Sequence, residues 1–217
     1  SLPSSPVRGV GGGTPIMDLI RSAIKRLQTR IEGSGSEEGV VRIDIDPDRV
    51  VCQYEMGACL KAAYGGRSSE FVTIDPLTAT TRIGFMFGAK LEQSRQRAAA
   101  CAILNVVAGF FCISRVLKSC PPECHRECLG ALRCEMGDVP VYPVGMMAAA
   151  KEKFSHLVTD PHAAEIILVV GDGLIHPEIG DLIEKYREEK RILFLSPSTG
   201  GVSALLGCEH WCPFGRA

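Results

Sequence analysis

The stretch Glu165-Ile-Ile-Leu-Val-Val-Gly171-Asp-Gly173 decides the fold class of this chain. Residues 165–170 form a continuous apolar run, which is typical of a strand that is covered on both faces of a sheet. A second run of this kind, Ile-Leu-Phe-Leu at 192–195, follows a segment at 177–190 whose apolar residues recur at helical spacing. Two such strands joined by a helix predict a parallel, Rossmann-like sheet with a right-handed crossover.

The same pattern continues on both sides of these two strands. We expect a strand at 139–144, a short helix at 146–157, and a last helix that is opened by residues 196–201 and runs through Leu206. Together these segments predict a Rossmann-like β-α-β-α domain over residues 139–217.

Residues 15–119 predict a small α+β domain with an antiparallel sheet and a buried helix. A helix at 15–31, with Thr14 as its N-cap and Pro15 at its first position, carries an apolar stripe of 3.6-residue period. Short strands are expected at 40–45, 49–54, 71–74 and 82–87. The segment 92–117 has a charged first turn and an almost wholly apolar body, so we expect a buried core helix in which Asn105 needs a hydrogen-bond partner.

The predicted fold class is therefore α/β, in two domains. A Pro-, Gly- and Ser-rich leader at 1–14 is expected to be disordered, and residues 120–138 form a cysteine-rich junction between the domains. The 24 Lys and Arg nearly balance the 25 Asp and Glu, which favours neither nucleic acid nor a membrane surface as a partner. Without a secretory signal we expect a cytoplasmic protein, and whether it is a homo-oligomer stays open.

Four of the ten cysteines lie in Cys120-Pro-Pro-Glu-Cys124-His-Arg-Glu-Cys128-Leu-Gly-Ala-Leu-Arg-Cys134. In the cytoplasm thiols stay reduced, so clustered cysteines indicate metal or redox chemistry. Thiolates favour zinc or an iron–sulfur cluster over magnesium or calcium. The spacing matches neither a zinc ribbon nor a ferredoxin, so the metal stays open between these two. Disulfides of a secreted domain and unligated thiols are the alternatives.

A regular helix cannot bring three of these thiols to one ion. Four residues of helix rise about 6 Å, so Cys120 and Cys128 would lie about 12 Å apart. The sulfurs around one zinc lie within about 4 Å of one another. We therefore expect an irregular loop that starts at Pro121 and Pro122.

A second group of candidate ligands, Cys208-Glu-His210-Trp-Cys212, lies near the end of the chain. It could complete a site begun at Cys120. Packed, unligated thiols at Cys208 and Cys212 fit the sequence equally well, because free cysteine is among the most buried residue types.

Two turns after the apolar strands predict a site for a small anion. One lies between strand and helix, where backbone N–H groups attract phosphate or carboxylate, and contains Ser198, Thr199, Gly200 and Gly201. The other contains Gly171, Asp172 and Gly173. Both should lie at the carboxyl edge of the sheet, where open α/β sheets bind ligands. Well-formed turns without a ligand are the alternative, and His176 stands where a third glycine would complete a dinucleotide-binding motif.

Three segments resemble a heavy-metal chelatase-like family of uncharacterised prokaryotic proteins. They are the Ala-rich stretch from Arg97 to Asn105, the stretch from Gly171 to Pro177, and Leu195-Ser-Pro-Ser-Thr-Gly200, in which Ser196 replaces a glycine of the family. The resemblance implies an enolase-N-terminal-like domain followed by a Rossmann-like domain, and metal handling rather than a defined reaction. The cysteine segment departs from the family pattern.

We therefore expect a metal- or iron–sulfur-binding protein of metal metabolism that also binds a small anion. Cys120, Cys124, Cys128 and Cys134 would ligate the metal, with Cys208 and Cys212 assisting. Two other functions stay open. One is an enzyme that acts on a phosphorylated or carboxylated small molecule and holds a structural zinc, and the other is a non-catalytic interaction protein with redox thiols.

Overall fold

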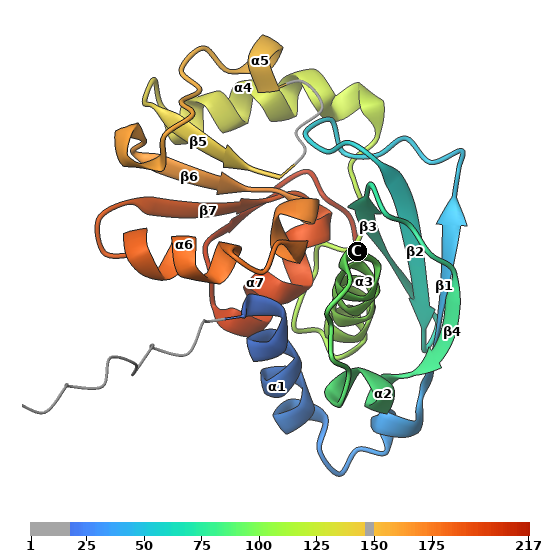
Figure 1. The fold of residues 1–217 in the computed structure, drawn as a ribbon. Coiled ribbons are helices and arrows are strands. Elements are labelled where there is room, and N and C mark those ends of the chain that lie inside the picture. The colour runs from blue at the N-terminus through green and yellow to red at the C-terminus, as the bar shows by residue number, and fades with distance from the viewer. Residues whose placement is uncertain (1–17, 146–149) are drawn as a thin grey trace, which may run out of the picture.

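The computed structural model describes residues 18–145 and 150–217, and it confirms the α/β class. The strands form two four-stranded sheets, an antiparallel one in the order β3-β2-β1-β4 and a parallel one in the order β5-β6-β7-β8. The two sheets lie on opposite sides of α3 and α7 (Figure 1). The antiparallel strands are β1 (Val40–Asp46), β2 (Ala58–Tyr64), β3 (Arg67–Thr73) and β4 (Ala79–Arg82). The parallel strands are β5 (Val141–Val144), β6 (Ile166–Val169), β7 (Arg191–Leu195) and β8 (His210–Trp211).

Seven α-helices are described around these sheets. They are α1 (Leu19–Ile31), α2 (Ile83–Phe87), α3 (Ser94–Phe110), α4 (His125–Met136), α5 (Ala150–Lys153), α6 (Ile179–Tyr186) and α7 (Gly200–Leu206). Within the described ranges, no helix is long and apolar enough to cross a membrane.

Helix α3 lies between the antiparallel sheet and α7 (Figure 1). It packs against β2 and β3 on one side and against α1 and α7 on the other. Its residues are buried almost throughout from position 97 to 109, which confirms the prediction of a helix covered on all sides. One hydrophobic core therefore runs from the antiparallel sheet through α3 to Ile167, Val169 and Phe194 of the parallel sheet.

Both faces of the parallel sheet are covered, as its continuous apolar strands predict. Ile167 and Val169 of β6 share a core with the apolar residues of α6. Their neighbours Ile166 and Leu168 point to the opposite face and share a second core with Leu132 of α4. The helix that carries the cysteine segment therefore packs on the parallel sheet.

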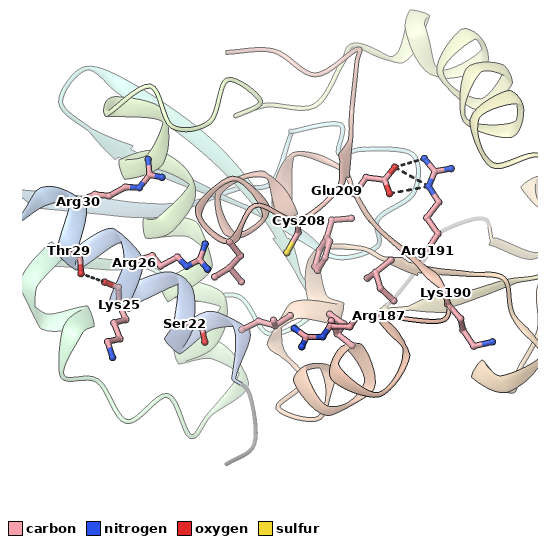
Figure 2. Close-up of a pocket in the computed structure, with 15 residues that line it drawn as sticks. Ser22, Lys25, Arg26, Thr29, Arg30, Arg187, Lys190, Arg191, Cys208 and Glu209 are labelled. Carbon is pink, nitrogen blue, oxygen red and sulfur yellow. Dashed lines mark hydrogen bonds and ion pairs between the residues drawn. The ribbon is translucent and has the colours of Figure 1, made fainter. Parts of the chain in front are cut away.

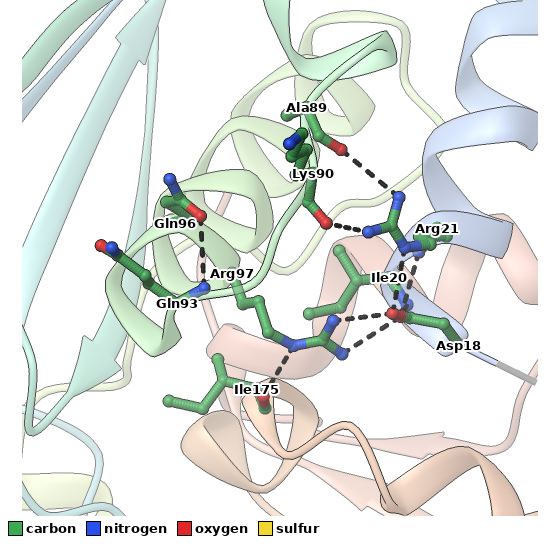
Figure 3. Close-up of polar contacts among 9 residues, drawn as sticks. All are labelled: Asp18, Ile20, Arg21, Ala89, Lys90, Gln93, Gln96, Arg97 and Ile175. Carbon is green, nitrogen blue, oxygen red and sulfur yellow. Dashed lines mark hydrogen bonds and ion pairs between the residues drawn. The ribbon is translucent and has the colours of Figure 1, made fainter. Parts of the chain in front are cut away.

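A buried ion pair joins the start of α1 to α3 (Figure 3). Arg97 donates from Nη1 to Asp18 Oδ2 at 2.7 Å and from Nη2 to Asp18 Oδ1 at 3.1 Å, and its Nε donates to the Ile175 carbonyl at 2.7 Å. Asp18 also accepts from the backbone N–H groups of Ile20 and Arg21 and so caps α1. One guanidinium thus ties together α1, α3 and the turn after β6.

Two of the four strands predicted in the first half are wrong. Residues 49–54 form a loop, and the return strand is β2. Residues 83–87 form α2, while the strand before them is β4. A short apolar run does not by itself distinguish a strand from a helix or a packed loop. Tyr54, Ile83 and Met86 are buried by tertiary packing and not because they belong to a strand. The strands predicted at 40–45 and 71–74 are confirmed as β1 and the end of β3.

Three predicted helix boundaries are also corrected. Helix α1 starts at Leu19 because Asp18 is extended and caps it; Thr14 and Pro15 lie outside the described residues. Helix α3 ends at Phe110 rather than Leu117, and Cys112 turns the chain with a φ of 56°. Within the predicted helix at 146–157, only 150–153 is described as helical, and 146–149 lie outside the described residues.

The irregular loop predicted for the cysteine segment is wrong. Pro122–Cys124 forms a 3₁₀ turn, and α4 continues regularly to Met136. The two prolines start this helix instead of breaking it, because proline is compatible with the first helical turn. The short parallel strand β8 was not predicted from the sequence.

Candidate functional site

The loop between β1 and β2 packs against α4 and places Tyr54 among buried cysteines. Gln53 Nε2 donates to the His125 carbonyl at 2.6 Å, and Lys153 Nζ donates to Gln53 Oε1 at 2.8 Å. Tyr54 is 2% exposed, and its hydroxyl lies 3.4 Å from Cys128 Sγ. A segment of the first half thereby reaches into the second.

Glu55, the next residue, lies between the two turns at the carboxyl edge of the parallel sheet. Its Oε1 accepts from the Ser196 hydroxyl at 2.7 Å and from the Gly171 N–H at 3.2 Å, and the Ser198 hydroxyl is a further donor. Burial raises the pKa of Glu55 to about 7; these donors oppose the shift, and the neighbouring Asp172 adds to it. The two turns meet at one carboxylate, and that carboxylate belongs to the chain itself.

The predicted anion-binding residues are enclosed by protein. Ser198 Oγ accepts from the Val72 N–H at 2.9 Å, and the Gly201 N–H donates to Asn105 Oδ1 at 2.8 Å. An external anion at these turns stays a prediction, and it would compete with the Glu55 carboxylate for donors. Buried members of the two turns are Gly171, Asp172, Gly173, Ser198, Thr199, Gly200 and Gly201.

Ser196 holds an unusual backbone conformation at this point. Its φ of 83° and ψ of 163° lie where glycine is favoured. Its hydroxyl donates to Glu55, and its carbonyl lies 2.8 Å from His210 Nε2. Burial lowers the pKa of His210, although this hydrogen bond opposes the shift, so the neutral imidazole donates to the carbonyl at neutral pH.

Glu55→Gln is expected to make the protein more stable at pH 8 and to leave its stability at pH 4.5 almost unchanged. Because the folded state raises the pKa of Glu55 to about 7, its contribution is complete below about pH 4.5 and is lost as the pH rises through 7. Glutamine keeps the acceptor oxygen without the buried charge, so we expect a gain of about 2 kcal/mol at pH 8.

Urea unfolding at the two pH values measures this gain, with Glu127→Gln as a control at an exposed position. A loss of stability at pH 8 in Glu55→Gln would show that the charged form is the one that the fold favours.

Four thiols lie near one another, and we call them the thiol cluster (Cys52, Cys120, Cys128 and Cys212). Burial, followed by the neighbouring thiols of Cys128 and Cys124, raises the pKa of Cys120 to about 11. Burial and then Cys128 and Cys120 raise the pKa of Cys212 to about 12. Burial and then Glu55 raise the pKa of Cys52, to which Cys212 and Cys128 also contribute.

Three of the six predicted ligands therefore lie in the thiol cluster. Cys124 is half-buried just before α4 and is an electrostatic neighbour of Cys120. Cys134 is exposed near the end of α4. Cys208 lies elsewhere, beside Arg26 of α1.

A polydentate metal site is not preformed by these thiols. Within residues 18–145 and 150–217, no group of three or more His, Cys, Asp or Glu side chains is arranged to hold a metal ion. Structural zinc and iron–sulfur clusters need about four protein ligands. The donor chemistry of the thiol cluster fits a soft metal, but its geometry fits a smaller number of ligands than these two cofactors require.

Sequence reasoning missed Cys52, Tyr54 and Glu55 as members of this region. The signal was present in Cys52-Gln-Tyr54-Glu55, where a thiol, a phenol and a carboxylate stand together. The sequence predicts a strand at 49–54 that ends before Glu55, and only the tertiary structure places these residues against α4 and the two turns.

No protein-family model and no curated protein matches this chain. Among solved structures, the chain is similar to a protein of unknown function from the DUF364 family of Pyrococcus horikoshii, with 10% identity and a TM-score of 0.44. The match covers 83% of this chain and 79% of that one. This similarity assigns no activity to the chain, and the heavy-metal chelatase-like resemblance stays a prediction.

Proposed function

We propose that this protein binds a soft metal ion through the paired thiols of Cys120 and Cys128. The observation that carries the proposal is that these two cysteines are buried electrostatic neighbours and that the Tyr54 hydroxyl lies beside Cys128. Soft thiolate ligands select soft metals, and a monovalent ion such as Cu(I) is satisfied by two of them. The proposal keeps the metal-handling role expected from the sequence and changes the ligand set.

The surroundings of the pair support a soft ion. Cys120 and Cys128 are each 4% exposed, so a bound ion would be kept from water. The Tyr54 hydroxyl, 3.4 Å from Cys128 Sγ, can donate to a thiolate there. Cys52 and Cys212 lie next to the pair and offer further sulfur ligands. Zinc or an iron–sulfur cluster would require these additional thiols to converge on one point.

Anaerobic titration with Cu(I) in the presence of a chromophoric Cu(I) chelator tests the proposal. The reduced protein is expected to withhold one copper ion per chain from the chelator. Cys128→Ser and Cys120→Ser should each abolish this retention, because one thiolate alone cannot compete. Cys134→Ser, at an exposed position on the same helix, is the matched control and should retain copper.

Two results would overturn the copper proposal. One is a wild-type protein that leaves all copper with the chelator, and the other is a Cys128→Ser variant that binds as well as the wild type. Metal analysis of the purified protein tests the two other cofactors predicted from the sequence, zinc and an iron–sulfur cluster. Stoichiometric zinc or iron that is lost in Cys120→Ser would assign the thiol cluster to one of those cofactors instead.

The same pair of neighbouring thiols favours a second candidate function, a redox-active dithiol. Cys120 and Cys128 would reduce a disulfide such as oxidised glutathione, giving one intramolecular disulfide and two released thiols. Mass spectrometry after incubation with oxidised glutathione tests this function. A loss of two hydrogens with a Cys120–Cys128 cross-link supports it, and stable mixed disulfides at exposed cysteines alone contradict it.

A further inference from the structure

A cavity of about 940 Å³ opens between α1 and the β7 side of the parallel half (Figure 2). One wall is α1, and the opposite side is formed by α6, β7 and the segment after α7. We call it the α1 groove. It lies away from the thiol cluster and shares no residue with it. Its volume is within the range of small-molecule sites in proteins.

Positive charge dominates the polar lining of the α1 groove. Its charged side chains are Lys25, Arg26, Arg30, Arg187, Lys190 and Arg191, with Glu209 as the only acid among the lining residues. This local excess contrasts with the overall charge of −1. A cleft lined by one sign of charge attracts ligands of the opposite sign.

The cations on the β7 side are already engaged by the protein. Arg191 pairs with Glu209 and Glu135, as the dashed lines to Glu209 in Figure 2 show. Arg187 pairs with Glu184 and Glu188. Lys190 donates to two backbone carbonyls, which hold its ammonium group at the rim without neutralising it. The two arginines on this side therefore have less charge to offer a ligand.

The cations on α1 are not neutralised in this way. Arg26 donates to the Leu205 carbonyl at 3.1 Å and has no carboxylate partner within the described residues. For Lys25 and Arg30, the described part of the chain shows no side-chain hydrogen bond or ion pair. Arg26 and Arg30 are four residues apart, a spacing at which like charges on a helix repel each other. No acidic residue occurs from Leu19 to Ile31 to relieve this repulsion.

The floor of the α1 groove is apolar. Its accessible part is formed by the half-buried Ile192, Leu206 and Cys208, above the buried side chains of Leu19, Ile183 and Phe194. An inorganic anion would use the cations and leave this surface in water. A ligand with an apolar body would bury it, at about 25 cal/mol for each Å² removed from water.

From these charges and this floor, we propose that the α1 groove binds an amphipathic anion, a carboxylate or phosphate carried on an apolar body. The anionic group would contact Arg26 and Arg30, and the apolar body would lie on the half-buried Ile192 and Leu206. The site is independent of metal binding by the thiol cluster. Its ligand would relieve the repulsion between the two arginines and cover the apolar floor.

Isothermal titration of the full chain with n-octyl phosphate and with octanoate tests the proposal and separates the two head groups. Inorganic phosphate and neutral n-octyl glucoside are expected to bind at least tenfold more weakly than the better of the two amphiphiles, because each lacks one of the required parts. Arg30→Glu should weaken binding by roughly tenfold or more, since it replaces a charge-assisted contact by repulsion.

Arg67→Glu is the matched control, because Arg67 is exposed at the β2–β3 hairpin. It should leave binding unchanged. Leu206→Gln tests the floor at a half-buried position and should weaken the octyl ligands more than inorganic phosphate. Thermal unfolding confirms that each variant is folded. Equal affinity for octyl phosphate and octyl glucoside, equal binding by Arg30→Glu and wild type, or binding of adenosine monophosphate without octyl phosphate would each overturn the proposal.

Discussion

Arg97→Met is expected to lower the free energy of unfolding by about 3 kcal/mol at pH 7. The Arg97 side chain is 3% exposed and that of Asp18 is 18% exposed, so methionine leaves a half-buried carboxylate without its partner. It also leaves the Ile175 carbonyl without the donor it has at 2.7 Å. Burial by itself would raise the pKa of Asp18. The Arg97 guanidinium and the first amides of α1 outweigh burial and hold the pKa of Asp18 below its usual range. The loss should therefore shrink as acid protonates Asp18.

Urea unfolding at pH 7 and pH 3.5 measures this effect. Arg95→Met is the matched control, because Arg95 is mostly exposed and lies 3.6 Å from Asp75. A surface pair of this kind contributes at most about 1 kcal/mol. Equal stability of the Arg97 and Arg95 variants would show that the link between α1, α3 and the turn after β6 is not holding the fold together.

Asn105→Asp is expected to lower the free energy of unfolding by about 3 kcal/mol at pH 7, because it exchanges a buried donor for a buried charge. Asn105 Nδ2 donates to the carbonyls of Glu70 and Ser198, each at 3.1 Å, while Oδ1 accepts from Gly201 N–H. An aspartate keeps the acceptor and places a second oxygen against two carbonyls. It would have to be protonated in the folded state, so its pKa is raised.

The sign of the pH dependence distinguishes this prediction from a simple loss of packing. A raised folded pKa means that the destabilisation is smallest at low pH and grows as the pH rises. Thermal unfolding at pH 4.5 and pH 8 checks this trend. Gln28→Glu, the same chemical change at an exposed position of α1, should have little effect at either pH. A pH-independent cost in Asn105→Asp would contradict the proposed cause.

Asn105 also explains why α7 approaches α3 closely. A side-chain carbon at Gly201 would overlap Asn105, so glycine is required at this contact. The sequence predicted a buried Asn105 in need of a partner. It did not show that the partners come from β3 and from the turn before α7, which together join the two halves of the molecule.

The sequence by itself determined the elements whose burial is encoded locally. The continuous apolar runs in β6 and β7 predict a parallel sheet covered on both faces, and the almost wholly apolar body of α3 predicts a helix inside the core. In each case the residue pattern along one segment specifies its surroundings, because covered faces disfavour polar side chains that lack partners.

Only the tertiary structure decided which groups meet. Cys52 and Glu55 reach the cysteine helix and the two turns through a loop, and no periodicity in that loop predicts its path. Cys212 lies in the thiol cluster while Cys208, four residues earlier, faces the α1 groove. The physical reason is that contacts between distant segments depend on how α3 and the two sheets pack. Spacing along the chain predicts candidate ligands, but it does not determine which of them lie together.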